Sequence, residues 1–369
     1  MAALAEPSAG PAPPALRLEP AARARVAEFL EARAAAIDAG QANVREGLAL
    51  LQRELLPAAG PEGPNCDLTR VAETIATAAA ADMSTAFSLW CQRMVLEYLA
   101  TAPEGSFLRE AILPRVLRTE LLGSTALAAA MAHHVGGTPL PVTWRRQDGE
   151  TVLDGRIAWA SNLQAPGFVV ITAAAHVDDG RAVLVAIPGD SPGLDVAPYP
   201  RLLALQATAS SSAALRGVRV GPEWVVSEDF TAFITRVRPA FLLLQSSFCW
   251  GLADRSLSEA AALLRGVRGP NEVLRPDLAG LQRAAAGLAA ALRGAAAGRG
   301  RGVPVRDLVR LRLECAQLAT AAVALEAKAV GGRGYVVDCP TARRLREAAF
   351  LPIQAPTEGQ LRWELARSA

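Results

Sequence analysis

The sequence predicts an α+β chain in which an N-terminal helical domain, a small β domain and a C-terminal helical bundle follow one another. Three observations support this prediction. Apolar residues recur at helical spacing in the first third, short segments separated by turn signals fill the middle, and helical spacing then returns. We expect a flexible leader at residues 1–16, an N-terminal helical domain at 17–125, a β domain at 126–230 and a C-terminal helical bundle at 231–369.

The first helical domain is predicted from apolar periodicity and from the residues that begin and end helices. Pro20 suits the first turn of a helix, and Gly40 suits its end. A segment rich in proline and glycine, residues 57–64, separates the second helix from the third. The predicted helices span residues 20–40, 44–55, 67–100 and 108–122.

The middle of the chain is predicted to form strands, because turn-forming pairs interrupt it at short intervals. Asp148-Gly149 and Asp179-Gly180 are hairpin signals, since glycine adopts the positive φ that tight turns need. Gly221-Pro222 closes the last strand. The predicted strands span residues 141–147, 150–161, 168–176, 182–188 and 213–220.

The C-terminal block returns to helical spacing. The connector at residues 298–302, Gly-Arg-Gly-Arg-Gly, is expected to be an exposed loop between two helices. Gly331 is placed where a helix would end. The predicted helices span residues 241–264, 276–293 and 305–330, followed by a final segment at 341–366.

Composition excludes several classes of protein. Of the 369 residues, 51% are hydrophobic, which is enough for a large core. The net charge of +2 gives no electrostatic reason to expect a nucleic-acid partner, and no apolar run reaches the roughly 20 residues of a membrane span. The five dispersed cysteines and three histidines form no disulfide framework or metal-binding pattern. Because residues 1–16 lack the features of a signal peptide, we expect a cytoplasmic protein with reduced thiols and no metal.

Two motifs resemble those of the acyl-CoA dehydrogenase family. Residues 331–335, Gly-Gly-Arg-Gly-Tyr, resemble the family's GGxGY turn, and Pro340, Arg346-Glu347 and residues 353–357 follow at the family spacing. Residues 155–162, Gly-Arg-Ile-Ala-Trp-Ala-Ser-Asn, resemble the family's G-x-K-x-W-I-T-N strand. The order of helical, β and helical blocks is also that of the family, so the resemblance implies its fold.

The resemblance implies an FAD cofactor. Trp159 would pack on the flavin ring, and Ser161 would keep the hydroxyl that the family places near flavin N5. The three glycines of the turn would let backbone N–H groups approach a phosphate, where a Cβ would obstruct them. The expected cofactor-binding residues are Trp159, Ser161, Asn162, Gly331, Gly332, Gly334 and Thr357.

Each of these residues also has a purely structural interpretation. Trp159 alone would more often be an ordinary core residue, and Gly331 alone would more often end a helix. Ser161 and Asn162 could form a turn at the end of a strand. The flavoprotein interpretation depends on finding all of them together and in order.

The sequence departs from the family at the catalytic base. The family uses a Glu in an I-Y-E-G-T motif to remove the α-proton of an acyl thioester while a hydride leaves Cβ for flavin N5. Here Ala355 holds that position, and alanine cannot accept a proton. Glu358 lies three positions further on, while His133 and His134 lie in the segment that replaces the family's TEPxxGSD loop. These three residues are candidate bases, because carboxylates and imidazoles can take a proton near neutral pH.

Three functions follow from this conflict. The first is FAD-dependent α,β-oxidation of an acyl thioester, carried by CoA or an acyl carrier, with a displaced base and an electron-transfer partner. The second is a catalytically degenerate subunit of a heteromeric acyl-CoA dehydrogenase. The third is a flavin monooxygenase on the same fold. The family's glycine turn meets the cofactor of a neighbouring subunit, so the resemblance also implies a homodimer or tetramer, or else a heteromer.

Overall fold

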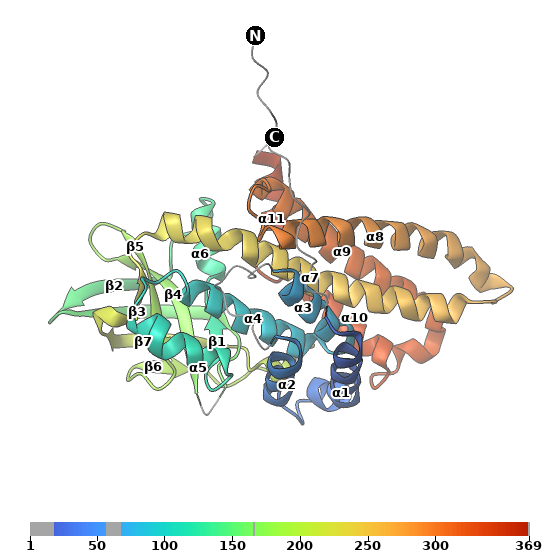
Figure 1. Cartoon of the computed structure of the whole chain (residues 1–369), viewed down its shortest axis with the longest axis horizontal. Coiled ribbons are helices and arrows are strands. Elements are labelled where there is room, and N and C mark those ends of the chain that lie inside the picture. Colours follow the sequence, from blue (N-terminus) through green and yellow to red (C-terminus); the bar gives the residue numbers. More distant parts are fainter. Residues whose placement is uncertain (1–17, 57–67, 165–166, 368–369) are drawn as a thin grey trace, which may run out of the picture.

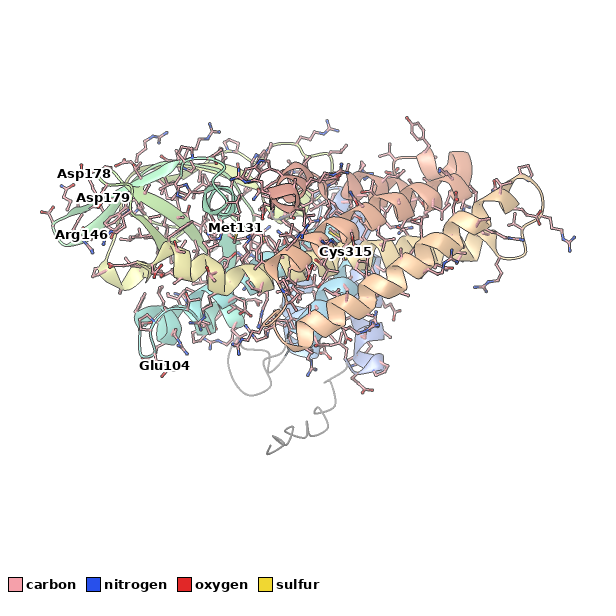
Figure 2. The ribbon with its side chains drawn as sticks, turned by 90° about the horizontal axis from the view of Figure 1, so that it is seen from above. Glu104, Met131, Arg146, Asp178, Asp179 and Cys315 are labelled. Atoms are coloured by element: carbon pink, nitrogen blue, oxygen red, sulfur yellow. The ribbon has the colours of Figure 1, made fainter. Side chains whose placement is uncertain are left out.

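The computed structural model describes residues 18–56, 68–164 and 167–367, and it shows a β-sheet at one end of an elongated assembly of helices (Figure 1). The sheet lies between the N-terminal and C-terminal helices in sequence. Figure 2 shows the two ends from above, with Asp178 and Asp179 at the outer hairpin of the sheet and Cys315 inside the helical bundle. The predicted α+β class and the order of its blocks are confirmed.

The N-terminal helices match the prediction except at Asp82. Residues 67–100 were expected to form one helix, but the structure divides the described part of this range in two. Asp82 has an extended backbone, and its carboxylate accepts hydrogen bonds from the backbone N–H groups of Ser84 and Thr85 at 3.1 and 2.9 Å. This N-cap begins a new helix, which is the usual role of aspartate at such a position. The helices are α1 (Pro20–Asp38), α2 (Arg45–Leu55), α3 (Thr69–Ala81) and α4 (Met83–Leu99).

The helix predicted to reach residue 122 is also shorter than expected. A π-helical turn (Leu108–Ile112) leads into α5 (Leu113–Leu117), and the next element is strand β1 (Leu122–Thr125). Gln92 of α4 fixes this change, because its amide donates to Val116 O at 2.5 Å and accepts from Gly123 N at 2.6 Å. A Cβ on Gly123 would lie 2.7 Å from a side-chain atom of Val95, so only glycine allows β1 to lie this close to α4.

Among the described residues the sheet contains eight strands. Seven follow the order β6-β7-β3-β2-β4-β5-β8, and β1 pairs in parallel with β4. All five predicted strands are present, and both predicted hairpin turns are confirmed, since Gly149 and Gly180 have φ of 83° and 72°. Strands β1, β6 and β8 and helix α6 (Ala128–His134) were not predicted. The remaining strands are β2 (Val142–Gln147), β3 (Glu150–Ala160), β4 (Phe168–His176), β5 (Ala182–Pro188), β6 (Leu194–Val196), β7 (Ser211–Val220) and β8 (Val225–Ser227).

The C-terminal bundle is built around α7, which runs from the sheet to the far end of the bundle (Figure 1). This helix begins at Phe230, earlier than predicted, because the Asp229 carboxylate accepts a hydrogen bond from Ala232 N at 2.8 Å. It packs against α3, α4, α8 and α9. The predicted final segment consists of two helices. The bundle helices are α7 (Phe230–Leu264), α8 (Arg275–Ala297), α9 (Val305–Val330), α10 (Pro340–Phe350) and α11 (Glu358–Arg367).

Two features are missing from the part of the chain that the structure describes. There, no helix is long and apolar enough to cross a membrane. The same residues contain no group of three or more metal-ligating side chains. The proposed domain boundaries stay predictions, and β1 joins the sheet from inside the range assigned to the first domain.

A buried charged cluster joins the start of α4 to α10. Glu347 Oε1 lies 3.7 Å from Arg343 Nε and 3.4 Å from Met83 N, and the Arg343 guanidinium donates to Ala81 O at 2.9 Å. Burial raises the pKa of Glu347 from 4.5 to about 7, and the nearby carboxylates of Asp82 and Asp38 act in the same direction against the guanidinium. The folded state therefore binds the carboxyl proton of Glu347 more tightly than the unfolded state does.

We expect Glu347→Gln to reduce the pH dependence of stability. Because the folded pKa lies above the unfolded value of 4.5, the unfolding free energy of the wild type falls as pH rises from about 4.5 to about 7. Urea unfolding at pH 5 and pH 8 should show a drop about 1–3 kcal/mol larger in the wild type than in the variant. The exposed carboxylate of Glu314 on α9 provides a control, since Glu314→Gln should leave the drop unchanged. Equal drops in the wild type and Glu347→Gln would contradict the assignment.

Candidate functional site

A cavity of about 380 Å³ lies where the end of β3 meets α4, α7, α10 and the loop before β7. Its walls are mainly aromatic and aliphatic. Hydroxyl groups gather on the β-domain side, and the only charged side chain among the described residues that line it is Arg346, paired with Asp38 of α1. The lining consists of Phe87, Trp90, Cys91, Thr125, Ala128, Trp159, Ala160, Ser161, residues 202–205, Thr208, Ser210, Phe241, Arg346, Ala349, Phe350 and residues 353–355.

Trp159 is a wall of the cavity and not an ordinary core residue. It lies near the end of β3, where the pairing with β7 shifts register between Ile157 and Ala160. The indole is 57% exposed in this chain, which is unusual for the largest apolar side chain unless it contacts a ligand or a partner. Trp159 and Ser161 both line the cavity, and their role in holding a flavin ring stays a prediction.

The helical wall is a rigid cluster of aromatic rings. Phe87 stacks on Trp90 with ring centroids 5.2 Å apart, and the edge of Phe350 meets Phe87 at 5.0 Å. Phe241 of α7 meets Trp90 at 5.0 Å. Aromatic pairs in this geometry hold one another in place. Cys91 lies on the same wall, and burial raises the pKa of its thiol far above the usual range, so the thiol stays neutral.

The floor of the cavity is formed by residues 353–355, the segment in which the sequence resemblance places the base motif. Ala355 lines the cavity, and its carbonyl oxygen accepts from Gln245 Nε2 at 2.9 Å and from Gln354 Nε2 at 2.7 Å. The fully buried Arg312 of α9 fixes both amides, because its Nε donates to Gln245 Oε1 at 3.1 Å and its Nη2 to Gln354 Oε1 at 2.8 Å. The floor is therefore held firmly, but residue 355 offers no proton-accepting side chain.

The candidate bases lie outside the cavity lining. Glu358 begins α11 and pairs with Arg362 at 2.5 Å. His133 Nδ1 lies 3.0 Å from Thr138 O, and both histidine rings contact the ring of Phe230. Burial lowers the pKa of His134, and the nearby Arg238 lowers it further. Among the described lining residues there is neither a carboxylate nor an imidazole.

The glycine turn lies apart from the cavity. Gly331 ends α9 with a φ of 69°, and the turn forms a short 3-10 helix. A Cβ on Gly331 or Gly332 would meet nothing within 4 Å, whereas one on Gly334 would lie 3.1 Å from Val330. Next to the turn, Tyr335 is 91% exposed, so this region presents open backbone beside an apolar surface.

Asn162 and Thr357 have structural roles in the isolated chain. Asn162 is buried with a φ of 62°, and its Nδ2 donates to Ser88 O and to Gly123 O, each at 3.0 Å. Thr357 is exposed and accepts a hydrogen bond from Gln360 N at 3.2 Å, at the start of α11. Neither residue lines the cavity as the structure describes it.

The residues present fit a flavin ring. A flat aromatic ring with a polar edge needs apolar walls and a few hydrogen-bonding groups at that edge. The cavity supplies the indole of Trp159, the aromatic cluster of α4 and the hydroxyl of Ser161. The open backbone of Gly331 and Gly332 also suits a phosphate, but neither glycine lines this cavity, so the turn would serve a cofactor approaching from outside the chain.

Comparison with known proteins shows the fold. No family model matches the sequence, and no curated protein matches it. An acyl-CoA dehydrogenase from Geobacillus kaustophilus matches with a TM-score of 0.82 at 14% identity, over 96% of this chain and 99% of that chain. A prolyl acyl carrier protein oxidase matches with a TM-score of 0.82 at 15% identity, over 94% and 97%. A dibenzothiophene monooxygenase from Paenibacillus sp. matches with a TM-score of 0.74 at 19% identity, over 94% and 95%.

The chain thus has the fold of the acyl-CoA dehydrogenases, and the predicted resemblance is confirmed at the level of structure. At these identities the likeness shows the fold and leaves substrate and reaction open. Structures on this fold include oxidases and monooxygenases as well as dehydrogenases.

Sequence reasoning missed most of the cavity wall. Phe87, Trp90 and Phe350 occupy helical positions whose apolar periodicity cannot distinguish a core face from a ligand face. The hydroxyl-rich run at residues 207–213, Ala-Thr-Ala-Ser-Ser-Ser-Ala, was a visible signal, because three adjacent serines before an apolar strand suggest a polar lining.

We expect Trp159→Ala to weaken FAD binding about tenfold while changing stability little. The indole is largely exposed in the isolated chain, so its removal costs little core packing, but it takes away the surface on which a ring can stack. Titration of the apo-protein with FAD and urea unfolding measure the two effects. Trp363→Ala on α11 is the matched control, because Trp363 is 38% exposed and lies outside the described cavity lining. Equal loss of FAD affinity in both variants would contradict the placement of the ring.

Proposed function

We propose that this chain is an oxidoreductase that binds FAD beside Trp159, takes an apolar substrate in the adjoining cavity and uses no protein base to remove a substrate proton. The observation that carries the proposal is the cavity lining, whose described residues include no carboxylate and no imidazole. Ala355 occupies the position of the usual base, and the fixed backbone around it leaves the floor intact. When bound, the flavin supplies the redox chemistry, and the protein supplies binding, orientation and exclusion of water.

Reaction of reduced flavin with oxygen fits this lining better than dehydrogenation does. Removal of an α-proton requires a group that can accept it, whereas flavin reduced by a separate reductase needs no such group on this chain. The Paenibacillus structure on this fold is that of a dibenzothiophene monooxygenase. The aromatic wall around Phe87 and Trp90 suits an aromatic or acyl group. An acyl thioester carried by CoA or by a carrier protein is the substrate class that the dehydrogenase and oxidase structures favour.

Dehydrogenation with a displaced base has weaker support. Glu358 would have to leave Arg362, and His133 or His134 would have to leave the contact with Phe230 to reach the cavity. The lowered pKa of His134 keeps its imidazole neutral, as a base must be. However, His134 does not line the cavity, which argues against its use as the base.

A partner-subunit function is the second candidate, supported by the exposed apolar surface next to the glycine turn. Tyr335, Val336 and Val337 are all exposed, and three adjacent apolar residues of this kind mark a surface that another chain covers. A second copy would give a homodimer or tetramer, and a related active chain would give a heteromer. In the heteromer, the turn would contact the cofactor of the active partner.

The visible spectrum of the purified chain distinguishes these functions. We expect flavin bands that persist when mixed acyl-CoAs are added without oxygen, and that bleach with an external flavin reductase and NADH. Bleaching by acyl-CoA would establish a dehydrogenase with a displaced base. A chain that binds no flavin, even when FAD is added, would contradict both enzymatic functions and favour the partner subunit.

Ala355→Glu tests whether the floor still has the geometry of a base site. We expect the variant to gain acyl-CoA-dependent bleaching of flavin that the wild type lacks, because the fixed carbonyl of residue 355 holds the new side chain toward the cavity. Ala355→Gln, of nearly equal size and without basicity, should gain nothing. Bleaching in neither variant, with FAD still bound, would show that the substrate part of the cavity has diverged.

A further inference from the structure

Three hydroxyl groups on the β-domain wall form a continuous hydrogen-bond chain. Thr208 Oγ1 lies 2.7 Å from the carbonyl oxygen of Leu205 and 2.7 Å from Ser210 Oγ. Ser210 Oγ lies 2.6 Å from Ser161 Oγ. All three hydroxyl residues line the cavity. Each of these three short distances needs one proton between its two oxygens.

The direction of the chain follows from counting protons. Each hydroxyl has one proton to donate, and a carbonyl oxygen can only accept. The contact with Leu205 therefore requires the proton of Thr208. Ser210 must then donate to Thr208, and Ser161 must donate to Ser210. In this arrangement every short contact contains a proton, and Ser161 presents only lone pairs to the cavity.

If the hydroxyl groups donate in the opposite direction, they make one hydrogen bond fewer before a ligand binds. If Thr208 donates to Ser210 and Ser210 to Ser161, then Ser161 can donate to a ligand, but the 2.7 Å contact between Thr208 Oγ1 and Leu205 O contains no proton. One hydrogen bond of ordinary net strength corresponds to about a fivefold preference. Without a ligand, the hydrogen-bonded hydroxyls therefore present an acceptor, the oxygen of Ser161, to the cavity.

The surrounding backbone holds the three hydroxyls in place. Asn162 N donates to Thr208 O at 2.8 Å, and Leu163 N donates to Ala209 O at 3.3 Å, so the loop is tied to the end of β3. Leu205 and Ala209 both have positive φ, which fixes an unusual turn around Thr208. Thr208 is 1% exposed and Ser161 8% exposed, while Ser210 is half-buried, so bulk water competes little for the hydroxyls at the two ends of the hydrogen-bond chain.

We propose that the Ser161–Ser210–Thr208 chain selects a ligand that presents an N–H or O–H group to this wall, and that Thr208 sets the preference. Thr208 is a positioning residue here, because it acts on the ligand through Ser210 and Ser161. Applied to FAD, the inference rests on the proposed function. A ring nitrogen that only accepts in oxidised flavin carries a hydrogen in reduced flavin, so a chain ending in an acceptor favours the reduced form.

Indole and benzofuran test the selection without flavin. The two probes have nearly the same shape, but indole has an N–H where benzofuran has an oxygen. In Thr208→Val, Ser210 loses its acceptor on residue 208 and can donate to Ser161 instead, which frees the proton of Ser161 for the cavity. Titration calorimetry should show the preference for indole over benzofuran falling at least about fivefold in Thr208→Val relative to the wild type. Thr172→Val, on a buried β4 threonine outside the described lining, should leave the preference unchanged.

The redox potential of bound flavin gives an independent measurement. Thr208→Val should lower the ratio of reduced to oxidised flavin affinity about fivefold, which is about 20 mV for a two-electron couple. An unchanged probe preference, or a wild type that binds neither probe, would overturn the inference. So would a potential that is the same in Thr208→Val and Thr172→Val.

These outcomes separate this inference from the proposed function. If the protein selects indole through Thr208 but retains no flavin, the inference stands and the proposed function is contradicted. If the protein binds flavin but Thr208→Val changes neither the probe preference nor the potential, the proposed function stands and the inference is contradicted.

Discussion

The amide of Asn162 is the contact on which the cavity depends. Its Nδ2 donates to Ser88 O on α4 and to Gly123 O on β1, at the point where the helical block, the first strand and the end of β3 meet. The aromatic wall belongs to α4, and Trp159 and Ser161 belong to the end of β3. One buried amide therefore fixes the distance between the two walls. Gln92 repeats the connection one turn further along α4, since it accepts from Gly123 N and donates to Val116 O.

The floor of the cavity depends on a second buried polar group. Arg312 is fully buried, and its partners are two side-chain amides and the carbonyl of Leu351. A buried guanidinium is costly unless its hydrogen bonds are satisfied, and here Nε and Nη2 have partners while the buried Nη1 has none, so the hydrogen bonds that Arg312 does make hold the two amides next to Ala355. An ordered floor without a proton-accepting side chain is compatible with the proposed binding of a ligand without a protein base.

The sequence predicts the architecture well because regular elements follow local rules. Helix α9 was predicted with the bounds the structure shows, from its periodicity and the glycine that ends it. The break at Asp82 was missed because the residues on both sides are equally helical, although Asp followed by Ser84 and Thr85 is a cap signal. Strand β1 was missed for a different reason. Its four residues pair with β4, more than 40 positions further on, and no local pattern contains that information.

The site could be predicted only where a motif carries it. Trp159 and Ser161 came from a short strand motif, and the structure brings them to the cavity. Ser210, the hydrogen-bonded neighbour of Ser161, lies 49 residues further along the sequence. The direction of the hydroxyl chain depends on a carbonyl, that of Leu205, which no residue type encodes. Substituting Ser for the family's Thr at position 161 keeps the hydroxyl, but its proton is then decided by groups on another loop. A motif can thus preserve an atom while the surrounding fold decides whether that atom donates or accepts a hydrogen bond.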